Sequence, residues 1–381
     1  MLRGRRFSVY IASDKSSFRV EVLGKSELDQ AFLEQWSELE ANALEANAFQ
    51  SQHFIIPALR YLTPAIAPTF VAIYLRQSRA DKLVALGTFQ QSPGVLNYPR
   101  KHKLAYSCLH SFLGGILVAN DYADAVIEVM FEFFKRHKNT WHAVQFRQIP
   151  GDGELFQLMT KASNSLGYSW RTTGKTERAY LPLEGCAKSC ISEFISSKRL
   201  ANMRRLKRKL GEKGKLEWRC LKGKQVDSRV ISDFLKLEDA GWKGEQGSSL
   251  LSNDAERRFF NEMTRGFVNA GQALFTQLRL DGKPIAVTSN YVSGNAAFAF
   301  KLGWDPEYAK FSPSVLNILS FTECARDHCY GLEYVDSGSK KDSFIDKLWS
   351  GRRTLVTGYF TFSESAKFLL ESIQGAKALI R

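Results

Sequence analysis

The sequence has 381 residues, 44% of them hydrophobic, and a formal net charge of +14 from 53 lysines and arginines against 39 aspartates and glutamates. This length favours two domains, the apolar content supports a packed core, and no uncharged apolar run is long enough to span a membrane. The charge excess indicates a polyanionic partner, such as a nucleic acid or a phosphate-rich coenzyme, or a contribution to solubility.

The basic N-terminus lacks the apolar segment and the cleavage site of a secretory signal. The six cysteines form no CxxC pair and no disulfide-module spacing, so we expect a cytoplasmic protein with reduced thiols. His328 beside Cys329, with Cys324 upstream, supplies too few ligands for a closed metal site. We therefore expect no metal.

The first half of the chain predicts a helix, antiparallel strands, a helix and a strand. Residues 28–47 place Phe32, Trp36, Leu39 and Ala43 at helical spacing, as an amphipathic helix requires. The other elements expected in this half are strands over 70–76 and 83–90, a helix over 123–137, a strand over 141–146, a helix over 155–166, and strands near Tyr168 and Arg178.

The second half repeats this order. The turns at 281–284 and 293–295 are rich in residues that tolerate turn dihedral angles. Two copies of one α/β unit are the simplest account, and a single large mixed-sheet domain is the alternative. The elements expected here are helices over 230–240 and 255–270, strands over 273–280, 285–292 and 296–302, a helix over 313–328 and a strand over 332–337.

Between the halves, residues 196–212 combine an apolar stripe of Leu200, Met203, Leu206 and Leu210 with lysines and arginines on the other faces. This pattern predicts a basic amphipathic helix. A solvated charged face explains it without a partner, so we expect no nucleic-acid partner. A nucleic-acid or membrane-surface binding module is the non-enzymatic alternative.

The segment EYAKFSPSVLNIL has the features of a phosphate site. Ser312 suits a helix N-cap, and Pro313 suits the first helical position. The start of a helix presents unpaired backbone N–H groups and the positive end of the helix dipole. Lys310 lies two residues before Ser312. A normal cap without a ligand is the alternative reading.

Two further segments carry candidate side chains. LEDAGWKGEQG puts Glu238, Trp242 and Lys243 at a helix end, where they either cap and pack or line a pocket. Asp336 follows a strand, where it could accept a proton from an amine, orient that amine, or accept backbone hydrogen bonds in the next turn.

Together, LEDAGWKGEQG, the hairpin at DGKPIA, the strand FAFKLGWD, EYAKFSPSVLNIL and YVDSGSKKDSFIDKLW resemble the second half of the Fem-like and CelD-type acyltransferases of the GNAT superfamily. WSELEANALEANAFQS resembles the opening of the same proteins. The resemblance implies an α/β (α+β mixed-sheet) fold of tandem GNAT-like domains, each with a mostly antiparallel central sheet flanked by helices. The expected parts are an N-terminal extension at 1–24, a first domain at 25–185 that is structural or acceptor-binding, a second domain at 186–362 that holds the acyl donor, and a C-terminal helix at 363–381.

The resemblance also implies how acetyl-CoA or another acyl-CoA is held. The pantetheine arm would lie along residues 298–303 and the pyrophosphate at 310–314, although FSPS has no glycine where many relatives have one. The implied cofactor-binding residues are Phe300, Leu302, Lys310, Phe311, Ser312 and Ser314.

Catalytic and acceptor-binding roles follow from the same resemblance. Phe344 and Ile345 stand where relatives often have Tyr-Lys, and Tyr308 is the nearest substitute for that tyrosine. The implied catalytic residues are Glu238, Asp336 and Tyr308, and the implied substrate-binding residues are Trp242, Lys243 and Lys301.

The expected reaction is acyl transfer, with acetyl as the expected group, from CoA to the amine of a small molecule or sugar. Cell-envelope and polysaccharide precursors are candidate acceptors. The enzymatic alternative is Fem-like transfer from aminoacyl-tRNA, against which stands the absence of a long helical hairpin insertion. The sequence leaves the oligomeric state open.

Overall fold

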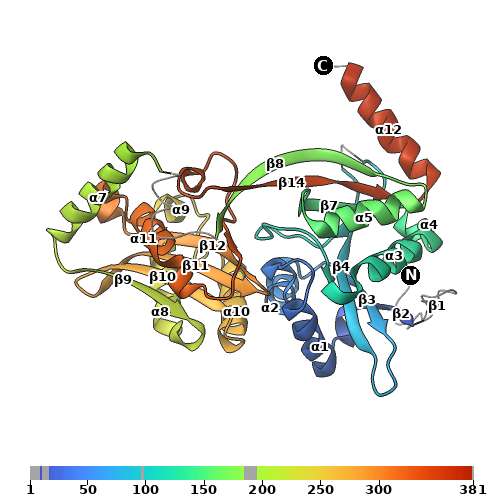
Figure 1. Cartoon of the computed structure of the whole chain (residues 1–381), viewed down its shortest axis with the longest axis horizontal. Coiled ribbons are helices and arrows are strands. Elements are labelled where there is room, and N and C mark those ends of the chain that lie inside the picture. Colours follow the sequence, from blue (N-terminus) through green and yellow to red (C-terminus); the bar gives the residue numbers. More distant parts are fainter. Residues whose placement is uncertain (1–8, 11–16, 96–97, 184–194, 380–381) are drawn as a thin grey trace. The chain divides into compact units, whose positions relative to one another are not determined.

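The computed structural model describes residues 9–10, 17–95, 98–183 and 195–379 (Figure 1). The chain forms two compact units. Unit 1 comprises residues 1–55, 63–177 and 353–381, and unit 2 comprises residues 56–62 and 178–352. No helix in the described ranges is long and apolar enough to cross a membrane. Within the same ranges, no group of three or more His, Cys, Asp or Glu side chains could hold a metal ion.

Unit 1 contains mostly antiparallel strands in the order β1-β2-β3-β4-β5-β7-β14-β8, with β6 paired to β4. β5 and β7 run parallel. Phe89 packs against Phe134 and Trp141, which joins the sheet to α3 and α4. The bounds are β1 Val9–Tyr10, β2 Phe18–Leu23, α1 Gln30–Ala41, α2 Gln52–Pro57, β3 Thr69–Leu75, β4 Lys82–Ser92, β5 His102–Ala105, β6 Leu117–Val118, α3 Ala123–Arg136, α4 Lys138–Trp141, β7 Ala143–Pro150, α5 Glu154–Ser165, β8 Trp170–Pro182, β14 Gly351–Thr361 and α12 Glu364–Leu379, where α2 and β8 extend into unit 2.

The helix predicted at 28–47 is shorter than expected. It begins where the Asp29 side chain accepts a hydrogen bond from the Phe32 N–H, and α1 ends at Ala41. Ala43 then forms a β-bridge with Ala119, and the Leu44 N–H donates to the Val118 carbonyl. Backbone pairing with β6 therefore ends the helix, a tertiary contact that periodicity cannot reveal.

Unit 2 contains a second mostly antiparallel sheet, in the order β8-β13-β12-β11-β10-β9. Only β12 and β13 run parallel among these described neighbours. The predicted fold class, mixed α/β with two units that each have mostly antiparallel strands flanked by helices, is confirmed. The bounds are α7 Ser197–Gly211, β9 Leu216–Lys222, α8 Ser228–Asp239, α9 Trp242–Glu245, α10 Asp254–Asn269, β10 Ala273–Leu280, β11 Lys283–Ser293, β12 Ala296–Trp304, η7 Pro306–Phe311, α11 Pro313–His328, β13 Tyr334–Asp336 and η8 Phe344–Lys347.

Helices cover both faces of the unit 2 sheet (Figure 1). Phe275 of β10 packs against Phe234 of α8, which stacks on Phe260 of α10 at 5.0 Å. The next strand residue, Thr276, accepts a hydrogen bond from Asn317 Nδ2 of α11. Because consecutive strand residues face opposite sides, α8 and α10 cover one face and α11 covers the other.

Two strands pair with partners from a distant part of the chain. β8 follows α5 of unit 1, and its end pairs with β13 in unit 2 through Leu181 and Val335. β14 follows η8 of unit 2 and pairs with β7 in unit 1 through Phe360 and Val144. The sequence analysis had assigned residues 353–362 to the second domain and 363–381 to a separate helix, whereas contacts place all of them in unit 1.

Candidate active site

The candidate site begins at an open strand edge in unit 2. β12 pairs with β13 only from Ala296 to Phe298, opposite Tyr334 to Asp336. Among the described residues, β12 continues to Trp304 without a β13 partner, while β11 stays paired on the other side. Where two neighbouring strands diverge, an extended ligand can bind beside one of them through backbone hydrogen bonds.

A β-bulge interrupts β12 in this open stretch. Ser289 of β11 lies opposite Lys301 and the next residue, Asn290, lies opposite Ala299, so Phe300 is the extra residue. The buried Ser289 hydroxyl donates to the Lys301 carbonyl at 3.1 Å and accepts from the Lys301 N–H at 3.2 Å. Bulges of this kind are common beside active sites because they redirect side chains.

The bulge places two consecutive side chains on the face covered by α8 and α10. Phe300 stacks on Phe260 of α10 at 6.2 Å. Lys301 Nζ lies 3.7 Å from Glu238 Oε1 of α8, and the Lys301 side chain is 13% exposed. Glu238 Oε2 also accepts the Leu250 N–H at 2.8 Å. The Glu238 carboxylate is therefore buried, charge-compensated and fixed in position.

Across β12 from α8, η7 leads into α11. Ser312 occupies the N-cap position in the left-handed conformation, with φ 53° and ψ 57°, and Pro313 is the first helical residue. The Leu316 N–H donates to the Ser312 carbonyl. Ser314 and Val315 lie in the first turn, where backbone N–H groups have no intrahelical acceptor.

The predicted N-cap role of Ser312 is correct in position but wrong in mechanism, because its side chain makes no capping hydrogen bond. The left-handed conformation is the one that glycine favours. Ser312 therefore forms this turn in FSPS with a backbone conformation that a glycine would adopt without strain.

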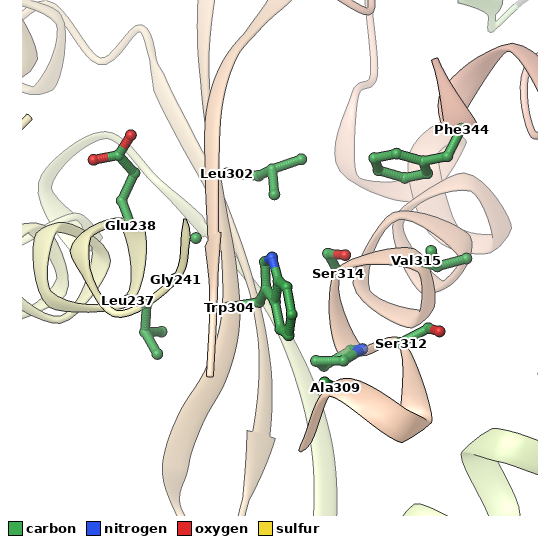
Figure 2. A pocket seen from close by; sticks show the side chains of 12 residues that line it. Leu237, Glu238, Gly241, Leu302, Trp304, Ala309, Ser312, Ser314, Val315 and Phe344 are labelled. Carbon is green, nitrogen blue, oxygen red and sulfur yellow. The ribbon is translucent and has the colours of Figure 1, made fainter. Parts of the chain in front are cut away.

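A cavity of about 480 Å³ lies at the open edge of β12, between the end of α8 and the start of α11. Figure 2 shows Leu237 and Glu238 on one side of the strand and Ser312, Ser314 and Phe344 on the other. The lining residues are Leu237, Glu238, Gly241, Leu302, Gly303, Trp304, Ala309, Ser312, Pro313, Ser314, Val315 and Phe344.

Gly303 allows α8 to approach β12 this closely. A Cβ atom at Gly303 would lie 2.6 Å from the carbonyl carbon of Leu237 and 2.9 Å from the Cα of Glu238. Backbone atoms cannot move aside as flexible side chains can. The glycine therefore fixes the distance between the cavity wall formed by α8 and the strand.

The three predicted catalytic residues occupy different surroundings. Glu238 lines the cavity, whereas Asp336 and Tyr308 do not. Asp336 is fully buried at the end of β13, 3.7 Å from Arg178 Nη1, and accepts the Gly338 N–H at 2.8 Å. Tyr308 is half-buried in η7 and packs against the core of unit 2. The structure thus gives Asp336 the turn hydrogen bond considered in the sequence analysis.

The predicted cofactor-binding residues divide into two groups. Leu302, Ser312 and Ser314 line the cavity. Phe300 and Phe311 are buried, and Lys310 is exposed with its ammonium 5.2 Å from the Phe311 ring centroid. Phe300 can therefore contribute its backbone, but its side chain faces α10.

Among the predicted substrate-binding residues, Lys301 pairs with Glu238 behind the strand. The side chains of Trp242 and Lys243 lie outside the described part of the structure. Trp304 was not predicted to be a site residue, although alternation along the strand could have placed it beside Leu302 on one face. Phe344 was noted only as a departure from a family pattern, and that ring lines the cavity.

Comparison with protein families agrees with this geometry. The family model described as "Acetyltransferase (GNAT) domain" spans the cavity and all its lining residues. Residues 197–344 match this GNAT family. The GNAT match covers α7 through the start of η8, which is most of unit 2. No curated protein matches the sequence.

Solved structures resemble the chain over nearly its whole length. FemX has 11% identity, with 87% of this chain and 95% of FemX covered, at a TM-score of 0.57. The C-terminal domain (DUF2156) of a putative lysylphosphatidylglycerol synthetase from Agrobacterium fabrum has 12% identity, covering 91% and 95%, at 0.52. A conserved protein of unknown function from Bacteroides thetaiotaomicron has 9% identity, covering 90% and 100%, at 0.51. These similarities show the fold.

Proposed function

We propose that this chain is an N-acyltransferase of the CelD-type branch that transfers an acyl group, acetyl in the simplest case, from a CoA thioester to an amine acceptor. The observation that carries the proposal is the cavity between the end of α8 and the start of α11, beside the part of β12 that extends beyond its pairing with β13. The GNAT match over the same residues supports it. The proposed acceptor is the amine of a small molecule or sugar, including envelope and polysaccharide precursors, and the proposed compartment is the cytoplasm.

In this proposal the donor lies along β12. The pantetheine arm adds to the open edge as a further strand, and its phosphate meets the N–H groups of Ser314 and Val315 at the positive end of the α11 dipole. Lys310, exposed on η7, contributes charge at the same end. The apolar side chains of Leu302 and Trp304 line the cavity and exclude water beside the arm.

The acceptor amine attacks the acyl carbon, the new C–N bond forms, the C–S bond breaks, and the CoA thiolate leaves. A backbone N–H near the bulge at Phe300 stabilises the oxyanion. Glu238 takes the proton lost by the amine, and the Lys301 ammonium compensates the buried carboxylate. Holding the two reactants together supplies about 7 kcal/mol or more of the rate acceleration.

We propose that Asp336 and Tyr308 support turnover without contacting the donor. The Arg178 pair and the Gly338 N–H favour a role for Asp336 in holding the end of β13. Tyr308 packs on the turn that leads to Ser312.

The corresponding region of unit 1 does not suit a phosphate. α3 follows strands β3, β4, β5 and β6 and precedes β7, which runs parallel to β5, as α11 precedes β13, which runs parallel to β12. Asp124 lies in its first turn, and Asp121 lies immediately upstream. These carboxylates would repel a phosphate, which favours unit 2 as the donor-binding unit.

Calorimetric titration with CoA and acetyl-CoA tests the proposal. We expect binding that weakens in Lys310→Glu and does not change in the control Lys224→Glu, which alters an exposed lysine outside the cavity lining. No binding of CoA or any acyl-CoA at millimolar concentration would refute the proposal.

The second candidate function is transfer of an aminoacyl group from tRNA. The exposed cations of α7 favour it, as does the fold shared with FemX. Titration with charged tRNA at physiological salt distinguishes it, since non-specific phosphate attraction gives only about 1–100 μM affinity under those conditions.

A further inference from the structure

The most cationic surface of unit 2 lies next to the proposed donor site. α7 has 15 residues and no carboxylate, and its cations are Lys198, Arg199, Arg204, Arg205, Lys207, Arg208 and Lys209. Among the described residues, the one carboxylate within 4 Å of these cations is Glu323, 3.9 Å from Lys207 Nζ. Like charges at this density repel one another along the helix. An anionic partner would remove that repulsion.

The position of α7 connects this surface with the cavity. α7 lies against η7, the turn that ends at Ser312 and carries the exposed Lys310 (Figure 1). Lys207 Nζ also donates to the Ser320 hydroxyl of α11 at 3.3 Å. Both contacts are with elements at the end of the cavity where the donor phosphate is proposed to bind, since η7 leads to Ser312 and α11 begins after it. A partner bound to α7 would therefore lie beside the outer end of a pantetheine arm in the cavity.

The apolar face of α7 is already occupied. Leu200, Met203 and Leu210 are buried in the core of unit 2. A helix that lies in a membrane surface needs a free apolar face, so α7 is not available for insertion into a bilayer.

The surface also lacks the features of a single-stranded nucleic-acid site, which stacks bases on exposed aromatic rings. No large exposed hydrophobic side chain lies on α7 or β9 within the described residues. A free coenzyme has only a few phosphates and could neutralise a small part of this helix. A cationic face that extends along a whole helix is complementary in charge to an acidic macromolecule.

We propose that the acyl donor is presented by an acidic carrier protein whose phosphopantetheine arm bears the thioester, and that α7 is the surface that binds this protein. The inference rests on the proposed function, because the arm occupies the same edge of β12. The chemistry is unchanged: the amine forms the C–N bond, the C–S bond breaks, the carrier leaves as the thiolate of its arm, and Glu238 takes the amine proton.

Binding of defined probes to the full chain tests this inference. The probes are a recombinant bacterial acyl carrier protein loaded with an acetyl-phosphopantetheine arm, the same protein without the arm, acetyl-CoA, and bulk tRNA. The test variant is Arg204→Glu/Arg205→Glu/Arg208→Glu, which reverses three exposed charges on α7. The matched control is Lys101→Glu/Lys138→Glu/Lys175→Glu, which reverses three exposed charges in unit 1.

We expect the acetylated carrier protein to bind more tightly than the protein without the arm, and its affinity to fall at least tenfold in the α7 variant. Acetyl-CoA affinity should stay within twofold in both variants, and the control should bind all probes as the wild type does. The affinity for the carrier should also fall with added salt, because exposed charges carry it.

Each other outcome overturns a defined part of the reasoning. Binding of acetyl-CoA without binding of the carrier protein overturns the inference and leaves the proposed function intact. Equal loss of carrier binding in the α7 variant and the control also overturns it, since net charge alone would then explain the attraction. Tighter binding of tRNA than of the carrier, lost in the α7 variant, overturns it in favour of aminoacyl transfer. Binding of neither acetyl-CoA nor the acetylated carrier refutes the proposed function itself.

Discussion

Gly303→Ala should destabilise unit 2 by forcing α8 away from β12. The added Cβ would lie 2.6 Å from the Leu237 carbonyl carbon, about 0.8 Å short of the 3.4 Å at which ordinary contact begins. Overpacking of this kind costs about 1–3 kcal/mol. For a unit of this size, the melting temperature should fall by about 3–10 °C. Hydrogen exchange should quicken in peptides from the end of α8 and from β12, and acetyl-CoA binding should weaken.

Gly241→Ala is the matched control. Gly241 lines the same cavity, yet a Cβ there meets nothing within 4 Å and its φ is not positive. We expect this variant to melt within about 2 °C of the wild type, as an unstrained surface change does. If both glycine variants melt at the same temperature, the close approach of α8 to β12 does not position the cavity wall.

Three further predictions concern buried or strained groups. Asp336→Asn should lower the free energy of unfolding by about 3 kcal/mol because it removes the carboxylate that pairs with the buried Arg178. Urea denaturation checks this, with Glu307→Gln as the control that changes an exposed carboxylate. Burial, reinforced by Arg100 and His102, lowers the pKa of His142 to about 4, so the unfolded chain binds the proton first as pH falls. Stability should therefore fall between about pH 6.5 and pH 4 and be unaffected by this group above that window. Urea midpoints across this range should show a shallower slope in His142→Gln, and an identical slope would contradict the assignment. Ser312→Gly should be more stable than Ser312→Ala by about 1 kcal/mol, because alanine keeps the strain of the left-handed conformation and glycine does not. Neither variant loses a capping hydrogen bond, since the Ser312 side chain makes none. Equal melting temperatures of the two variants would argue against this backbone conformation.

The elements that could be predicted from the sequence are those whose conformation depends on neighbouring residues. The turn at Asp281 and Gly282 has φ values of 46° and 76°, as a tight hairpin requires, and β10, β11 and β12 lie where alternation predicted them. The α11 start at Pro313 was also predicted correctly. These features depend on residues a few positions apart, so periodicity and turn chemistry reveal them.

Long-range contacts caused the errors. β9 was missed because LEWRCLK follows a basic segment, and its strand conformation depends on pairing with β10. β14 was missed because its partner β7 is encoded some two hundred residues earlier. At the site, the catalytic role of Asp336 stays a prediction, but its place at a strand end did not reveal the buried Arg178 that the fold brings beside it. A one-residue bulge at Phe300 likewise decides which side chains face α8, and no sequence pattern shows it.

The origin of β8 and β14 has a consequence for how the polypeptide is made. When the ribosome has synthesised residues up to the end of α5, β14 does not yet exist. β7 therefore cannot pair with β14 until residues 351–361 have emerged. Cutting the gene before Arg178 would yield a first fragment that lacks β14 and a second that lacks the unit 1 part of β8. Neither fragment is thus expected to mature alone.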